Sequence, residues 1–166
     1  FRERERLIDL FEEITGDRMM YAFFRAGGLA WDVPVNFESR VEEVLLSSEQ
    51  GIKDMDGLLT QNEIFLARTK QIGKIDAIDA IDWGMSGPSL RASGVDYDIR
   101  KAEPYLFYDQ IDFDVITGKN GDVFDRYFVR LQEMRESIKI IKQCLKHLNP
   151  GKTLAEGASR NLRTPP

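Results

Sequence analysis

A run of apolar residues with helical spacing, from Val123 to Leu148, most constrains what this chain can fold into. Its apolar residues recur every three or four positions, which places them along one side of a long helix. Asp122 is placed before the run as a helix cap, and Asn149–Gly151 follows it as a stop signal. The side expected to be apolar consists of Tyr127, Leu131, Met134, Ile138, Ile141 and Leu145.

The rest of the chain predicts further helices and little sheet. Residues 1–15 and 36–59 show helical apolar spacing, and Gly16 is placed to end the first of these helices. Shorter helices are expected after the capping segment Thr60–Glu63 and over Lys74–Gly84. The predicted fold class is therefore mainly α with a small amount of β.

Two segments differ from the helical pattern. From Arg18 to Pro34 an aromatic-rich run meets the pair Gly27-Gly28, which predicts a buried segment followed by a turn. Between Pro104 and Gly118, apolar and acidic residues alternate, and this is the clearest strand pattern of the chain. The alternating positions are Ile111, Asp112, Phe113, Asp114 and Val115.

Composition limits the classes of function. The chain of 166 residues suits one domain, and its net charge of −5 argues against a dedicated nucleic-acid binder. No apolar run approaches the ~18 residues of a membrane span. Cys144 is the single cysteine, which excludes an internal disulfide and a cysteine-ligated cluster built by this chain alone. His147 is the single histidine, so acid–base chemistry is poorly supplied.

The remaining motifs favour structure over chemistry. In a strand, Asp112 and Asp114 share one face while Asp109 lies on the other, which favours a solvated surface over a metal site. The glycines at Gly27-Gly28 and in Ser86–Ser89 lack the spacing of phosphate-binding loops. We expect no catalytic, cofactor-binding or metal-binding residue in this chain.

The segment Ser86–Lys101 is the most unusual, because it mixes glycine, proline, serine and charge with regularly spaced apolar residues. Its charges suit hydrogen-bond anchoring of a folded loop, since guanidinium groups grip carboxylates and carbonyls. The favoured interpretation is a loop fixed to its own domain. The alternative is a loop fixed to a neighbouring subunit or lining a cavity. The anchoring charges are Arg91, Asp98, Arg100 and Lys101.

Several motifs, in order and at compatible spacing, resemble the D subunit of respiratory complex I, the proton-pumping NADH:quinone oxidoreductase. They are FRAGGL at Phe24–Leu29, SGPSLRASG at Ser86–Gly94, DIRK at Asp98–Lys101, Pro104-Tyr105 and Tyr108-Asp109. That family is related to the large subunit of nickel–iron hydrogenases. The resemblance runs from Phe1 to about Gly151, and its departures, such as Tyr97 where the family usually has tryptophan, are mild.

The resemblance implies a helical part of a nickel–iron-hydrogenase large-subunit-like fold. Residues 1–151 are then expected to be the central part of a domain like that of the D subunit, and residues 152–166 a linker or disordered tail. The helix that starts at Phe1 without a capping residue also suggests a chain cut from a longer one. The family's quinone-headgroup histidine and tyrosine are expected upstream of Phe1. No catalytic residue is therefore carried over, and the piece alone is expected to be inactive.

As to partners, the resemblance implies packing against the iron–sulfur subunit beside the quinone cavity, with the cluster held by that neighbour. Quinone is then the substrate of the complete subunit, and the membrane arm is reached through other subunits. The implied location is the peripheral arm of a membrane complex, on the cytoplasmic side in bacteria or in the matrix or stroma of an organelle. Nucleic acid is not an expected partner.

Thirteen residues are the candidate structural or interface positions. Two other functions stay open: a helical assembly scaffold without a redox role, and a subunit of an energy-converting membrane hydrogenase. The candidates are Arg25, Gly27, Gly28, Ser86, Gly87, Arg91, Ser93, Gly94, Asp98, Arg100, Lys101, Tyr108 and Asp109.

Overall fold

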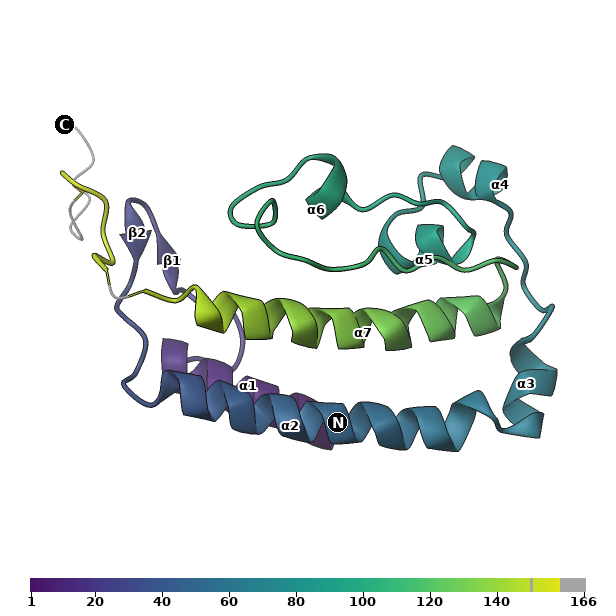
Figure 1. The fold of residues 1–166 in the computed structure, drawn as a ribbon, viewed down its shortest axis with the longest axis horizontal. Helices are drawn as coiled ribbons and strands as arrows, with labels where there is room; N and C mark the ends of the chain where they lie inside the picture. The colour runs from purple at the N-terminus through teal and green to yellow at the C-terminus, as the bar shows by residue number, and fades with distance from the viewer. Residues whose placement is uncertain (150, 159–166) are drawn as a thin grey trace. The chain divides into compact units, whose positions relative to one another are not determined.

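The computed structural model describes residues 1–149 and 151–158. These residues form helices and one small hairpin, which confirms the predicted mainly α class (Figure 1). The chain divides into two compact units. The first comprises Phe1–Ser48 and the chain from Leu148 onwards, and the second comprises Glu49–His147.

The first unit contains α1 (Arg2–Thr15), the hairpin of β1 (Phe24–Arg25) and β2 (Gly28–Leu29), and the beginning of α2 (Phe37–Met55). The predicted stop at Gly16 is confirmed, because this residue is left-handed and its N–H donates to the carbonyl of Glu12. The two antiparallel strands pair residues 24 with 29 and 25 with 28. The apolar residues buried in this unit are Ile8, Leu10, Ala30, Val41, Val44 and Leu45.

The aromatic run from Arg18 to Pro34 is not the buried segment that we expected. Met19, Met20 and Phe24 are 68%, 89% and 84% exposed, respectively. The predicted turn at Gly27-Gly28 is confirmed as the turn of the hairpin. Apolar content without a clear period does not say which side chains face inward, and strands of only two residues offer too small a face to bury them.

The second unit contains the end of α2 and the remaining helices. A π-helical turn, η1 (Asp56–Thr60), continues α2, so the long helix predicted over 36–59 is confirmed with an irregular last turn. Short helices follow in order: α3 (Glu63–Thr69), α4 (Ala77–Asp82), α5 (Gly87–Ala92) and α6 (Ile99–Ala102). The longest helix is α7 (Val123–Lys146).

Local sequence explains where most of these helices begin. The side chains of Asn62, Asp76, Asp98 and Asp122 each accept a hydrogen bond from a backbone N–H in the first turn of the helix that follows. Such caps satisfy donors that have no partner inside the helix, and each stabilises it by roughly 1 kcal/mol. The caps predicted at Asp122 and within Thr60–Glu63 are therefore confirmed.

The long helix α7 is buried on more sides than its apolar stripe predicts. Ile138, on the predicted side, is buried, whereas Met134 on the same side stays 37% exposed. Ile140 lies outside the predicted stripe, yet it is buried in a cluster with Ile111 and Phe113. The extended segment before α7 runs beside this second side (Figure 1).

The strand predicted between Pro104 and Gly118 is not formed, although its alternation of buried apolar and exposed acidic residues is present. The backbone of this segment bonds to side chains of α7 in place of a neighbouring strand. The Asp112 N–H donates to Gln143 Oε1 at 2.9 Å, and Gln143 Nε2 donates back to the Asp112 carbonyl at 2.6 Å. Two residues on, the Asp114 N–H donates to Glu136 Oε2 at 2.9 Å. The alternation of apolar and acidic residues therefore indicates that one face of the segment is buried, but not that the segment belongs to a sheet.

Candidate functional site

The segment Ser86–Lys101 contains two short helices, α5 and the start of α6, joined by residues 93–98, which begin with a turn at Ser93-Gly94. Helix α5 ends as the N–H of Gly94 donates to the carbonyl of Arg91. Beside it, Ser93 Oγ donates to the carbonyl of Ile75 at 2.9 Å. The segment is therefore fixed by its own backbone and by the residues that precede it.

Arg91 is the centre of the contacts that hold this segment. It is only 7% exposed, and its Nε donates to Glu133 Oε1 of α7 at 2.7 Å. A terminal nitrogen donates to the carbonyl of Tyr97 at 3.0 Å and lies 3.6 Å from Asp98 Oδ2. One buried guanidinium thus connects α5, the turn after it and the middle of α7, which is the geometry that favours arginine over lysine.

Asp98 pairs with a second arginine in the same cluster. Arg100 Nε and a terminal nitrogen donate to the two carboxylate oxygens at 2.9 and 2.6 Å, and the Arg100 N–H donates to Oδ1 at 3.0 Å. These hydrogen bonds from Arg100 hold the pKa of Asp98 below its usual value, although burial of the carboxylate opposes the effect. The same pairing with Asp98 raises the pKa of Arg100. Both groups are therefore charged at neutral pH.

Aromatic rings complete this cluster on the side of the extended segment. The Arg100 guanidinium carbon lies 4.8 Å from the ring centre of Phe113 and 5.8 Å from that of Tyr108. The Lys101 ammonium lies 4.6 Å from the Phe113 ring centre. Such cation–π contacts add to the ion pairs. We call Arg91, Asp98, Arg100, Lys101, Tyr108, Phe113 and Glu133 the anchored-loop cluster.

The structure brings some of the candidate residues together and not others. Asp109 is exposed beside the cluster. Arg25, Gly27 and Gly28 belong to the first unit, whereas the other candidates belong to the second. The candidates that shape α5 are Ser86 at its N-cap, Gly87, Ser93 and Gly94. The candidates that meet in one set of contacts are Arg91, Asp98, Arg100, Lys101 and Tyr108.

Sequence reasoning missed Glu133, although it is the main partner of Arg91. The missing signal was a second stripe on α7, with the spacing of four, three, four and three residues that keeps side chains on one helix face. This stripe mixes apolar and polar residues, so a search for apolar periodicity alone does not find it. Its members, which pack against or bond to the residues before α7, are Glu133, Glu136, Ile140 and Gln143, with Val129 buried at its start.

The pair Gly27-Gly28 lies against residues 153–155, a later part of the first unit. The Leu29 N–H donates to the carbonyl of Thr153, and the Ala155 N–H donates to the carbonyl of Gly27, both at 2.8 Å. A Cβ atom on Gly28 would lie 2.2 Å from the Thr153 carbonyl oxygen. The glycine is therefore required by the close approach of two backbones. The part of the predicted tail at residues 152–158 bonds to this hairpin, and residues 159–166 lie outside the described residues.

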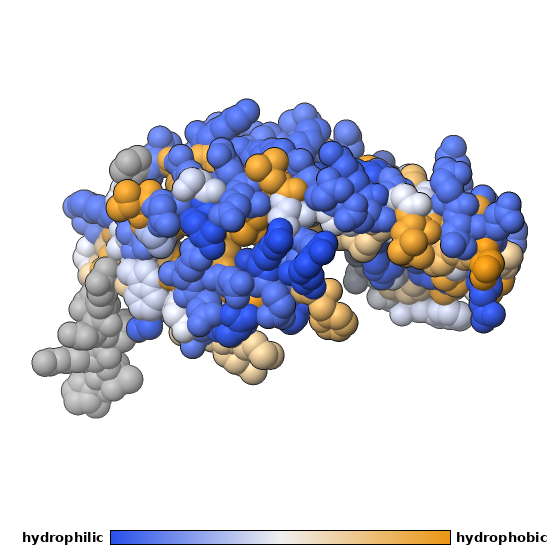
Figure 2. Space-filling view, turned by 90° about the horizontal axis from the view of Figure 1, so that it is seen from below, coloured by the Kyte–Doolittle hydropathy of each residue, from blue (hydrophilic) through white to orange (hydrophobic). Residues whose placement is uncertain are grey.

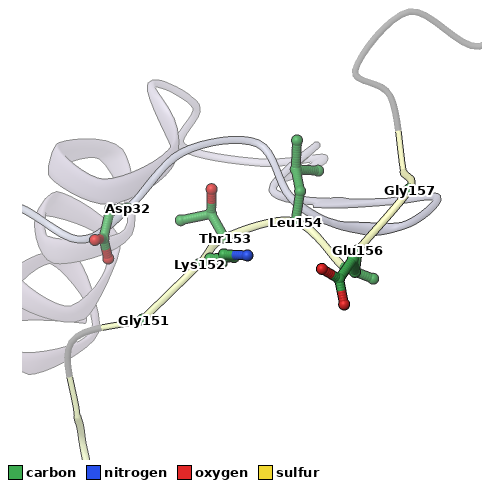
Figure 3. A pocket seen from close by; sticks show the side chains of 8 residues that line it. Asp32, Gly151, Lys152, Thr153, Leu154, Glu156 and Gly157 are labelled. Carbon is green, nitrogen blue, oxygen red and sulfur yellow. The ribbon is translucent and has the colours of Figure 1, made fainter.

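The same segment borders the pocket drawn in Figure 3. Asp32 lies on one side of this open pocket of about 560 Å³, and Gly151–Gly157 form the rest of its lining. The charged side chains along the lining are those of Asp32, Lys152 and Glu156. The lining holds no histidine, cysteine or serine.

The described residues show neither a metal-binding cluster nor a membrane-spanning helix. In the part of the chain that the structure describes, no group of three or more histidine, cysteine, aspartate or glutamate side chains is placed to hold a metal ion. Among the helices of residues 1–149, none has the length and apolar content needed to cross a membrane.

These features define a mainly helical protein in which a buried arginine fixes a polar loop to the longest helix. The protein-family model described as "Respiratory-chain NADH dehydrogenase, 49 Kd subunit" matches residues 1–165. The chain belongs to this family, which confirms the resemblance to the D subunit of complex I.

Named relatives agree with the family match. The chain is 52% identical to the D subunit of NADH-quinone oxidoreductase from Citrifermentans bemidjiense over 156 residues, which is 94% of this chain and 40% of the relative. It is 46% identical to the second D subunit of the same enzyme from Chloroflexus aurantiacus, covering 100% of this chain and 41% of the relative. For the D subunit from a Wolbachia of Brugia malayi, identity is 42% and the chain spans 42% of the relative. The chain thus spans about two fifths of the length of these relatives.

Proposed function

We propose that this chain is part of the quinone-reducing subunit of NADH-quinone oxidoreductase, where it helps to form the interface with the iron–sulfur subunit beside the quinone cavity. The observation that carries the proposal is the family match over residues 1–165. It is supported by identities of 42–52% to relatives named as the D subunit of this enzyme. Residues 1–151 are proposed to be the central part of the corresponding domain.

The role proposed for this chain is positional. The anchored-loop cluster fixes the segment Ser86–Lys101 before any partner arrives, and a preorganised surface loses little conformational entropy on binding. The candidate interface residues gather at or beside this cluster and at Gly27-Gly28. Electrons would reach quinone from a cluster held by the neighbouring subunit, as the family resemblance implies, and the single cysteine of these 166 residues, Cys144, could not hold such a cluster by itself.

The complex is proposed to hold this chain in its peripheral arm, on the cytoplasmic side in bacteria or in the matrix or stroma of an organelle. Quinone is the proposed substrate of the complete subunit, and the membrane arm is a partner through other subunits. A scaffold without a redox role would share the helical fold and the anchored loop. A test must therefore measure electron transfer as well as association.

The test is affinity purification of the epitope-tagged, full-length protein from membranes of its source organism. We expect it to recover a multisubunit complex that transfers electrons from NADH to a short-chain quinone, with the activity lost on adding rotenone. A recovered assembly without this activity would support a scaffold and contradict the proposal. Recovery of the tagged protein alone would contradict both.

Two variants then test the proposed positional role. Arg91→Ala and Arg100→Ala are expected to lower the amount of assembled complex, because each releases one part of the loop. Arg18→Ala is the matched control, since it removes an arginine whose side chain is 44% exposed in the first unit. Normal assembly and activity in both loop variants would show that the loop does not support the interface.

A further inference from the structure

Three adjacent apolar residues, Tyr105–Phe107, form an exposed tip in the second unit, which we call the Tyr105–Phe107 tip. Their exposed fractions are 50%, 84% and 60%. Single exposed apolar residues are normal, and Figure 2 shows hydrophobic residues in small groups among hydrophilic ones on one face. Three consecutive exposed residues of this size form a larger apolar surface, of the kind that marks interaction sites.

The backbone of this tip is held in an uncommon conformation. Leu106 has a φ of 52°, in the left-handed region that bulky side chains rarely adopt. One hydrogen bond closes the turn around Leu106, from the Tyr108 N–H to the carbonyl of Tyr105 at 3.1 Å, and a second follows it, from the Gln110 N–H to that of Phe107 at 2.9 Å. A strained turn that is maintained while its side chains face water is a feature of functional surfaces.

The base of the tip is joined to the anchored-loop cluster. The ring centres of Tyr105 and Tyr108 lie 4.9 Å apart, and those of Tyr108 and Phe113 lie 6.1 Å apart. Phe113 is 1% exposed, so this chain of rings begins in the core and ends at the surface. The tip is therefore presented in one conformation, which lowers the entropy that a partner must overcome on binding.

Two exposed carboxylates flank the tip in the sequence. Glu103 precedes it and Asp109 follows it, and both are exposed. Lys101 is also exposed, with its ammonium over the ring of Phe113, and Arg100 is paired with Asp98, so the exposed charges beside the tip are two carboxylates and one ammonium. An acidic border around an apolar tip is complementary to an apolar pocket edged by basic residues. The same border is repelled by an anionic lipid surface, which attracts basic segments.

We propose that the Tyr105–Phe107 tip inserts into an apolar pocket, edged by lysine or arginine, on another protein subunit of the same complex. The proposal rests on the proposed function, since it requires that this chain is part of a multisubunit assembly. Leu106 and Phe107 are the anchor residues, because buried apolar and aromatic anchors account for most of the affinity of an interface. Glu103 and Asp109 meet the basic edge of the pocket.

The first test is a competition for assembly in the source organism. A tagged full-length variant is expressed beside the wild-type protein, and the share of purified complex that contains each is measured. We expect Leu106→Ser with Phe107→Ser to lower incorporation by about tenfold or more, as loss of a central anchor does. Glu103→Lys with Asp109→Lys should lower it by about threefold or more, since the charges border the contact.

The matched control is Leu58→Ser in η1, because Leu58 is 70% exposed and belongs to the same unit. We expect it to leave incorporation unchanged. Equal losses in the control and the tip variants would overturn the proposal, as would wild-type incorporation of the tip variants. Hydrogen exchange of α7 in the tip variants should match the wild type, and lost protection would make the tip a folding element and also overturn the proposal.

The second test places the photo-crosslinking residue p-benzoylphenylalanine at position 106 in the assembled complex. We expect an adduct with a different polypeptide, at a peptide that contains lysine or arginine beside apolar residues. An adduct only with lipid, with a second copy or with the same chain would overturn the proposal. Absence of the protein from any NADH-oxidising complex would contradict the proposed function instead, so the two failures are distinguishable.

Discussion

The two units use arginine in opposite ways. In the first unit, Arg18 bonds to three carboxylates of α1, those of Glu5, Asp9 and Glu12, at 2.6–2.7 Å. All four side chains are 44–54% exposed. In the second unit, the side chain of Arg91 is 8% exposed and its closest carboxylate is that of Glu133, at 2.7 Å. Arg18 of the first unit therefore has more carboxylate partners than Arg91 of the second unit, but it is the more exposed of the two.

The comparison shows that burial, more than the number of ion pairs, decides what an arginine contributes. Exposed pairs gain little, because water screens the charges and two long side chains must be ordered. A buried arginine has lost its water, so its partners must all be present. Arg91 connects three segments of its unit, whereas Arg18 connects a turn to a helix that already ends at Gly16.

The largest effect is expected from Arg91→Ala. The change removes the buried partner of Glu133, which is itself partly buried, and the donor to the carbonyl of Tyr97, and breaking a buried ion pair typically costs about 3–5 kcal/mol. Hydrogen exchange of the α7 amides at increasing urea concentration measures the loss. Arg91→Met is the companion variant, because it keeps most of the volume while removing the charge. An effect of Arg91→Ala no larger than that of Arg18→Ala would remove the distinction between the two units.

A smaller effect is expected from Gly28→Ala. This variant tests whether the close backbone contact at Gly28, more than the exposed arginine pairs, stabilises the first unit. A methyl group 2.2 Å from the Thr153 carbonyl must push the two backbones apart, at a cost of about 1–3 kcal/mol. The amides of Leu29 and Ala155 should then exchange faster. Gly16→Ala is the control, because its φ is also positive, at 80°, but nothing lies within 4 Å of the added atom. Equal exchange in both variants would show that backbone strain alone is responsible.

A further effect is expected from acid. Arg100 holds the pKa of Asp98 below its usual value of about 3.9. The pairing therefore makes its full contribution to the stability of the second unit at any pH well above 3.9. The stabilisation is lost as the pH falls through the lowered pKa and the carboxylate takes up a proton. Urea unfolding followed by circular dichroism from pH 6 to pH 2 measures it. Asp98→Asn should flatten the acid side of the curve, and Asp96→Asn controls for the change in net charge.

The smallest effect is expected from Arg18→Ala. Hydrogen bonds with Asp9 and then Glu12 raise the pKa of Arg18, but the group is charged at any working pH and lies in water. The urea midpoint of the first unit should stay within experimental error at physiological salt. A clear loss that disappears at 1 M salt would show that this surface cluster contributes more than its exposure suggests.

Sequence alone could predict the features that are coded locally. The caps at Asp76 and Asp122, the stop at Gly16 and the turn at Gly27-Gly28 each depend on residues a few positions apart. The same holds for the anchoring charges, which the sequence identified by residue type. The partner of Arg91 lies 42 residues away on a polar position of α7, so nothing near it in sequence points to it.

The features that could not be predicted depend on contacts between distant segments. Alternation at Ile111–Val115 shows that one face is buried, but a strand also needs a neighbour, and here α7 takes that place through Gln143. The exposed aromatic residues near Phe24 carry the same apolar signal as buried ones. The close approach at Gly28 involves Thr153, more than a hundred residues later.

The pairing of Asp112 with Gln143 also has a consequence in time. The two residues are 31 positions apart, and a ribosome adds about 5–20 residues per second, so the helix side chain follows its partner by about 2–6 s. During that interval the alternating segment has left the ribosome with its backbone groups unpaired, as an open strand edge. Slower elongation during that interval would lengthen this exposure without changing the finished protein.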